Sequence, residues 1–154
     1  MFNYTDISTV ELSLPTQIGF ERVAMACSAA FARYVGFLPE RIEDLKTAVC
    51  EACLNAIEHG NKGKPDARVI ITMTYDGEAI NVYVKDQGDG IKDIPDDPDI
   101  EKKLLHLEAP RGLGMFLIRQ LVDEFEFNIL SDDGHTVRIQ IKGGPEVESY
   151  QAST

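Results

Sequence analysis

Three groups of residues in this sequence are of types and spacings that could do chemistry, and the first is a polar row on a predicted helix. Steps of four residues separate its members, which are Thr47, Glu51, Asn55 and His59. In an α-helix this spacing forms one slowly drifting row, with the Cβ atoms of Glu51 and Asn55 roughly 6 Å apart. A carboxylate and a carboxamide offer oxygen ligands suited to Mg²⁺, which favours few protein ligands together with substrate phosphates. The alternative is a solvated helix face of ordinary polar residues.

The second group follows directly on a predicted strand and consists of Asp86-Gln87-Gly88-Asp89-Gly90. Two glycines spaced by one residue let the backbone turn sharply and lie close to a ligand. The ionised carboxylate of Asp86 accepts hydrogen bonds, and the exocyclic amine of a purine would suit it. The alternative is a plain strand-ending turn, in which Asp and Gly are common.

The third group, Arg111-Gly112-Leu113-Gly114, opens another predicted helix. Glycines at a helix start expose backbone N–H groups at the positive end of the helix dipole, where phosphate oxygens bind. Arg111 adds a fixed positive charge. A flexible hinge before a helix is the alternative interpretation. The sequence has neither a P-loop nor a GxGxxG motif followed by a suitable acidic residue.

Hydrophobic periodicity predicts the elements that position these groups. The predicted helices cover residues 16–34, 41–58 and 113–124, and His59-Gly60-Asn61 ends the second. The predicted strands cover residues 10–14, 68–75, 79–85, 125–130 and 136–141, the last four as two hairpins. The apolar face of the first helix is predicted to be Phe20, Val23, Ala24, Cys27, Ala30, Phe31 and Tyr34. Because strict βαβ alternation is absent, we expect an α/β (α+β) two-layer sandwich, a mixed, mostly antiparallel sheet with helices on one face.

Composition limits the classes of function. The 154 residues are 44% apolar, enough for one domain, and 26 acidic against 15 basic side chains argue against direct nucleic-acid binding. No apolar run approaches the roughly 18 residues of a membrane span, and the N-terminus lacks signal-peptide features, so we expect a cytoplasmic protein without a membrane partner. An odd number of cysteines, three, predicts structural thiols rather than a disulfide scaffold or a metal site.

In their order along the chain, the three groups resemble the boxes of the GHKL (Bergerat) ATP-binding fold shared by gyrase, histidine kinases and MutL. The segment EACLNAIEHGN resembles the N box, DQGDGI the first glycine box and RGLGMFLI the second. The resemblance spans roughly residues 10–142. It implies an ATP-binding kinase domain over residues 1–143 with a lid at 92–110, followed by a polar C-terminal tail at 144–154.

The resemblance also implies roles for individual residues, with ATP and Mg²⁺ as cofactors. Glu51 would be the general base and Asn55 the Mg²⁺ ligand. The other implied nucleotide-binding residues are Asp86 at the adenine amine, Gly88 and Gly90 around the ring, Thr136 in the adenine water network, and Arg111, Gly112, Leu113 and Gly114 at the phosphates.

The segments EACLNAIEHG and RGLGMFLIRQLVDE are together most similar to those of bacterial anti-sigma-factor serine kinases of the RsbW and SpoIIAB type. That resemblance implies a homodimeric protein that binds a sigma factor and phosphorylates a STAS-domain anti-anti-sigma factor. One alternative is a non-catalytic binding module that ATP and ADP switch between partner affinities. A weaker alternative is a phosphatase-linked regulatory domain of a larger response-regulator system.

Overall fold

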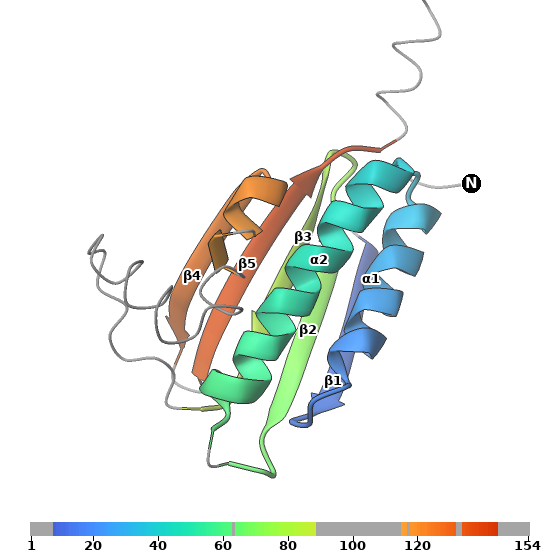
Figure 1. The fold of residues 1–154 in the computed structure, drawn as a ribbon. Coiled ribbons are helices and arrows are strands. Elements are labelled where there is room, and N and C mark those ends of the chain that lie inside the picture. Colours follow the sequence, from blue (N-terminus) through green and yellow to red (C-terminus); the bar gives the residue numbers. More distant parts are fainter. Residues whose placement is uncertain (1–7, 63, 89–114, 117, 132–133, 145–154) are drawn as a thin grey trace, which may run out of the picture.

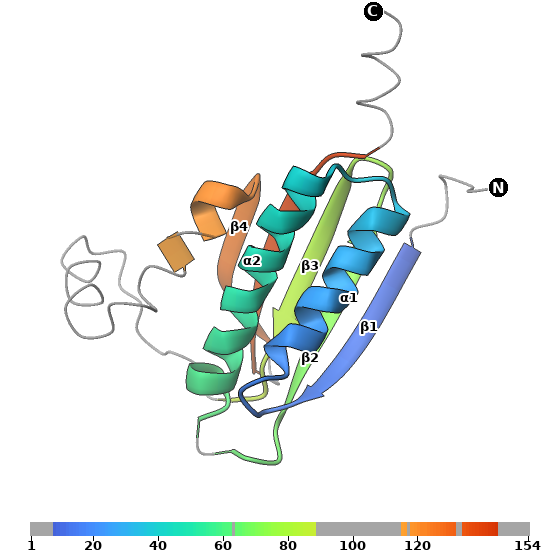
Figure 2. The ribbon, with the colours of Figure 1, turned by 45° about the vertical axis from the view of Figure 1, so that its right-hand side comes forward.

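The computed structural model describes residues 8–62, 64–88, 115–116, 118–131 and 134–144. Its strands form one five-stranded sheet in the order β1-β2-β3-β5-β4, and two helices lie side by side on one face of it (Figures 1 and 2). All four strand pairings are antiparallel. The elements are β1 (Ser8–Pro15), α1 (Glu21–Tyr34), α2 (Pro39–Asn55), η1 (Ala56–Gly60), β2 (Arg68–Tyr75), β3 (Ala79–Lys85), β4 (Glu124–Ser131) and β5 (Gly134–Lys142). The predicted two-layer sandwich is confirmed.

The hairpin of β2 and β3 has the predicted bounds, because a strong alternation meets a strong turn signal. In β2 every second residue from Val69 to Tyr75 is buried. The Asp76 carboxylate accepts hydrogen bonds from the backbone N–H groups of Glu78 and Ala79, both at 2.9 Å, and Gly77 adopts a φ of 97°. A side chain and a glycine together therefore define this turn.

The first helix differs from its prediction in start and in orientation. It begins at Glu21, whose carboxylate accepts a hydrogen bond from the backbone N–H of Gly19 at 2.6 Å. The predicted apolar face was wrong for Val23, Ala30 and Tyr34, which are exposed. The side chains that α1 buries are mostly small: Glu21, Ala24, Ser28, Ala29, Phe31 and Ala32. Small residues let α1 pack closely against α2 and the sheet, so close approach decided the face more than side-chain hydrophobicity did.

The second helix is longer than predicted and ends in a widened turn. After Asn55 the chain continues as the π-helical turn η1, and the N–H of Asn61 donates to the carbonyl of Ala56, five residues back, at 2.9 Å. Such turns are rare and are frequent at functional sites. The third predicted helix is helical at 115–116 and 118–121, and β4 already begins at Glu124. Within the described ranges, no helix has both the length and the apolarity to cross a membrane.

Candidate functional site

A pocket lies between the end of α2 and the neighbouring ends of β3, β4 and β5. Its lining residues are Ala52, Asn55, Ala56, Gly60, Val84, Asp86, Phe127, His135 and Val137. Apolar and aromatic side chains form most of the wall, and three polar side chains, Asn55, Asp86 and His135, interrupt it. Mostly apolar walls with a few placed polar groups are typical of small-molecule sites.

Asp86 is the buried acid of this pocket, in the first residue after β3. Its backbone N–H donates to the carbonyl of His135 at 2.9 Å, and its Oδ1 accepts from the N–H of Gly88 at 3.1 Å. Burial raises the pKa of the Asp86 carboxyl, whereas the backbone N–H donors of Gly88 and His135 and the charges of His135 and Lys64 oppose that rise. The structure thus holds a desolvated hydrogen-bond acceptor at the pocket wall.

Three glycines let the backbone close around Asp86. A Cβ on Gly60 would overlap the Asp86 carboxylate, one on Gly88 would overlap the carbonyl oxygen of Gly60, and one on Gly134 would overlap the carbonyl oxygen of Asp86. The absence of side chains therefore brings η1, the loop after β3 and the start of β5 into main-chain contact. This close packing against η1 explains why residue 88 must be a glycine, and the sequence alone did not reveal this reason.

Asn61 joins the same elements from the other side, and sequence analysis assigned it only to the helix stop. It is 2% exposed, and its Nδ2 donates to Thr16 Oγ1 at 2.9 Å and to the carbonyl of Arg68 at 3.1 Å. Its Oδ1 accepts from the backbone N–H of Gln87 at 2.8 Å. One buried carboxamide thereby fixes the end of η1, the end of β1 and the loop that carries Asp86. Its partners lie up to 45 residues away in sequence, so no local pattern signals them.

Glu51 and Asn55 lie one turn apart on α2, as predicted, and both are partly buried. Asn55 lines the pocket, and its carboxamide oxygen is of the hard type that Mg²⁺ accepts, so the donor set fits that ion. Glu51 lies outside the lining. Burial, followed by the charge of Glu58, raises the pKa of the Glu51 carboxyl.

Thr136, expected in the adenine water network, is not among the residues that line the pocket, and its role stays a prediction. The side chains of His135 and Val137 line the pocket, and alternation along β5 turns the intervening Thr136 to the opposite, open face of the sheet. Arg138 lies on that open face as well, where it donates to Glu124 at 2.9 Å and Glu126 at 2.7 Å. The pocket residue that the sequence prediction missed is therefore His135, one position away.

The predicted phosphate side falls outside the described residues. This holds for Gly90, for the lid at 92–110, and for the turn made of Arg111, Gly112, Leu113 and Gly114.

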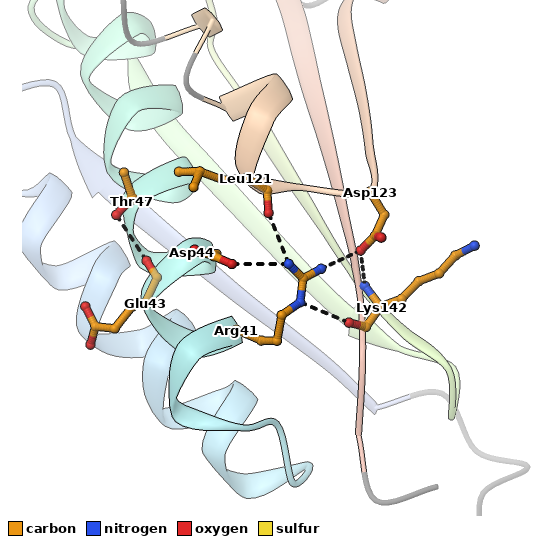
Figure 3. A network of polar contacts seen from close by, with 7 residues as sticks. All are labelled: Arg41, Glu43, Asp44, Thr47, Leu121, Asp123 and Lys142. Atoms are coloured by element: carbon orange, nitrogen blue, oxygen red, sulfur yellow. Dashed lines mark hydrogen bonds and ion pairs between the residues drawn. The ribbon is translucent and has the colours of Figure 1, made fainter. Parts of the chain in front are cut away.

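The helical segment that follows is anchored to the opposite end of α2 by Arg41 (Figure 3). Its Nη1 donates to the carbonyl of Leu121 and to Asp44, both at 3.2 Å, and its Nη2 pairs with Asp123 at 2.6 Å. Arg41 Nε also donates to the carbonyl of Lys142 at 3.4 Å. Arg41 thus ties the segment after the predicted phosphate turn to both α2 and β5.

A family model described as the histidine kinase-like ATPase domain matches residues 15–141. The chain belongs to this family. The match includes all elements that build the pocket, from the end of β1 to β5. Serine-protein kinase RsbW of Bacillus cereus is 30% identical to this ATPase-domain chain over 133 residues, with 83% of this chain and 81% of the relative covered. RsbW of Bacillus pumilus is 30% identical over 137 residues, with 85% and 83% covered.

Two solved structures share the fold of this RsbW-like ATPase domain. One contains the RsbU and RsbW domains of a Mycobacterium tuberculosis protein, with a TM-score of 0.63 at 18% identity. That alignment covers 90% of this chain, but the chain spans only 33% of that longer protein. The other is the SiaB–SiaC complex of Pseudomonas aeruginosa, with a TM-score of 0.52 at 14% identity and 87% and 88% covered.

Proposed function

We propose that this chain is an ATP-dependent serine protein kinase and anti-sigma factor, which binds a sigma factor and phosphorylates a STAS-domain anti-anti-sigma factor. One observation carries the proposal. Asn55 and the buried acceptor Asp86 line one pocket, and Glu51, an acid with a raised pKa, lies one helical turn from Asn55 just outside that lining. The relatives named serine-protein kinase RsbW support the same activity.

In this proposal the base of ATP enters the pocket and its amino group donates to Asp86. Val84, Val137 and Phe127 offer apolar surface to the ring. Asn55 binds Mg²⁺, which offsets charge on the phosphates when it is bound. The remaining phosphate and ring contacts come from Gly88, Gly90, Arg111, Gly112, Leu113 and Gly114, and residues 92–110 form the lid of a domain that ends near residue 143.

Glu51 acts as the general base. It takes the proton from the serine hydroxyl of the protein substrate while the serine oxygen bonds to the γ-phosphorus and ADP leaves. A carboxylate with an ordinary pKa is a weak base near neutral pH. Burial and the neighbouring charge of Glu58 make Glu51 more basic, which favours proton transfer.

The partners follow from the same family. We propose a cytoplasmic homodimer that binds its sigma factor and its antagonist directly and binds neither nucleic acid nor membrane. The structural similarity to a protein solved as a two-protein complex, SiaB–SiaC, is compatible with a fold that presents a protein-binding surface.

The test is transfer of labelled phosphate from ATP to a cognate STAS protein, with ATP binding measured in parallel by calorimetry. We expect Glu51→Gln to reduce transfer at least 100-fold and to change ATP affinity little, because a general base contributes about 10²–10⁴-fold. The matched control is Glu43→Gln, an acid on the same helix whose side chain is 70% exposed.

Two outcomes would contradict the proposal. ATP binding without any phosphoserine in the unmodified protein would leave a nucleotide-switched binding module. Loss of ATP binding in Glu51→Gln would show that Glu51 holds the nucleotide and is not the base.

A further inference from the structure

The pocket wall contains a buried polar atom that the proposed mechanism does not use, Nδ1 of His135. The atom is inaccessible to solvent and has no hydrogen-bond partner among the residues that the structure describes. Asp86 Oδ1 lies 3.8 Å away, which is beyond hydrogen-bond distance. Leaving such a group buried without a partner is costly, so an unsatisfied group of this kind in a pocket calls for a physical explanation.

The neighbouring carboxylate determines which form of the imidazole is favoured. Neutral histidine carries its proton on one of two nitrogens, and an adjacent negative charge favours the form with the proton facing it. Beside Asp86 that form has the N–H on Nδ1. The side chains of Asp86 and His135 are 11% and 12% exposed, so the pocket contains an acceptor and a donor side by side, both largely removed from water.

These two groups are the polar side chains available to the edge of a base. Of the described lining residues, the other polar side chain is Asn55, which the proposed function assigns to Mg²⁺. Val84, Val137 and Phe127 are apolar and can contact only the faces or the apolar rim of a ring. A base edge that satisfies both polar groups needs a donor next to an acceptor.

We propose that His135 is a base-recognition residue, whose Nδ1–H donates to the ring nitrogen beside the exocyclic amine of adenine while Asp86 accepts from that amine. The inference rests on the proposed function, since it assumes that this pocket binds ATP. Adenine offers such a nitrogen on either side of its amine, at N1 and at N7. Guanine has a carbonyl oxygen where adenine has the amine, so its edge would place an acceptor against the Asp86 carboxylate. His135 and Asp86 together therefore select adenine.

The test compares ATP with 1-deaza-ATP and 7-deaza-ATP, each lacking one of the two ring nitrogens, by calorimetry on the full chain with Mg²⁺. We expect one analogue to bind the unmodified protein about tenfold more weakly than ATP, the effect of one hydrogen bond. His135→Phe keeps a flat ring but has no donor. In this variant ATP should bind about tenfold more weakly, and the discrimination against that analogue should disappear. His135→Ala provides a second measurement should the larger ring fail to fit.

Gln140→Ala is the control, because Gln140 lies on the same strand with its side chain on the open face, near Asn81. It should keep the discrimination of the unmodified protein. The assignment of His135 is overturned if both His135 variants retain that discrimination, or if the unmodified protein binds both analogues as tightly as ATP. Absence of ATP binding by the folded, unmodified protein would instead overturn the ATP site itself, and the role of His135 with it.

Discussion

The two ends of the continuous helix formed by α2 and η1 are fastened to the sheet by different chemistry. At the pocket end, glycines allow close main-chain contacts between η1, the loop after β3 and the start of β5, and the buried side chain of Asn61 fixes these segments further. At the other end, Arg41 and its two acidic partners are about one-third exposed, and the contacts are made by long side chains. We therefore expect the pocket end to tolerate substitutions poorly and the ion pairs at the Arg41 end to weaken as salt is added.

Gly88→Ala should have the largest effect of the changes considered. The new Cβ would overlap the carbonyl oxygen of Gly60, so the loop that carries Asp86 must move away from η1. We expect ATP affinity to fall at least tenfold, measured by calorimetry. Gly77→Ala is the control: its φ of 97° makes alanine strained, but a Cβ there meets no other atom. It should lower stability by about 1 kcal/mol and leave ATP binding unchanged.

Asn61→Ala should come next, because it removes three hydrogen bonds from a buried site at once. The N–H of Gln87 and the carbonyl of Arg68 lose their partner, and we expect the free energy of unfolding to fall by about 2–3 kcal/mol in urea titrations. Asn81→Ala tests the comparison, since Asn81 is a less buried asparagine on the open face of the sheet. An equal loss of unfolding free energy in both variants would show that burial of the Asn61 hydrogen bonds does not determine how much they stabilise the fold.

Arg41→Ala should cost less, about 1–2 kcal/mol, and the loss should shrink as salt is added. Its matched control is Lys46→Ala, whose ion pair with the exposed Glu43 spans 3.3 Å within one helix and should contribute less than about 0.5 kcal/mol. A salt-independent loss at Arg41 would show that packing of its stem, rather than its charge, anchors the segment at residues 118–121.

Asp86→Asn should have the smallest effect on stability and the opposite sign. Burial raises the pKa of Asp86 in the folded state, so its contribution is fully present below the unfolded-state pKa, about 4, and is lost as pH rises through the folded-state pKa. We therefore expect the variant to be more stable than the unmodified protein at pH 7, with the difference disappearing below about pH 4, in urea titrations without nucleotide. A less stable variant at pH 7 would show that the hydrogen bonds to the carboxylate outweigh its desolvation.

The prediction from sequence is correct where the determining contacts are local. Alternating side chains and an Asp-Gly turn set the bounds of β2 and β3, and helical spacing placed Glu51 beside Asn55. It is incomplete or wrong where contacts with residues far away in the sequence determine the structure. The buried face of α1 depends on how closely it approaches α2, and the partners of Asn61 come from three other segments.

The place of Thr136 relative to the pocket depends on the alternation of side chains along β5. A resemblance assigns a position along a strand, but a shift of one residue moves a side chain from one face of the sheet to the other. His135, which occupies the pocket face, could have been found from the sequence only by counting the alternation back from the buried Ile139 and Ile141.

The widened turn η1 also determines how Asn61 is rotated about the helix axis relative to Glu51 and Asn55. In an α-helix each residue advances by about 100° around the axis. If the hydrogen-bonded turn from Ala56 to Asn61 contained one residue fewer, the Asn61 carboxamide would point in a direction about 100° away from its present one. In that position it would no longer meet Thr16 and Gln87 together. The additional residue of this π-helical turn changes the direction in which Asn61 points. Glu51 and Asn55 can therefore keep their direction on α2 while Asn61 points toward its own hydrogen-bond partners.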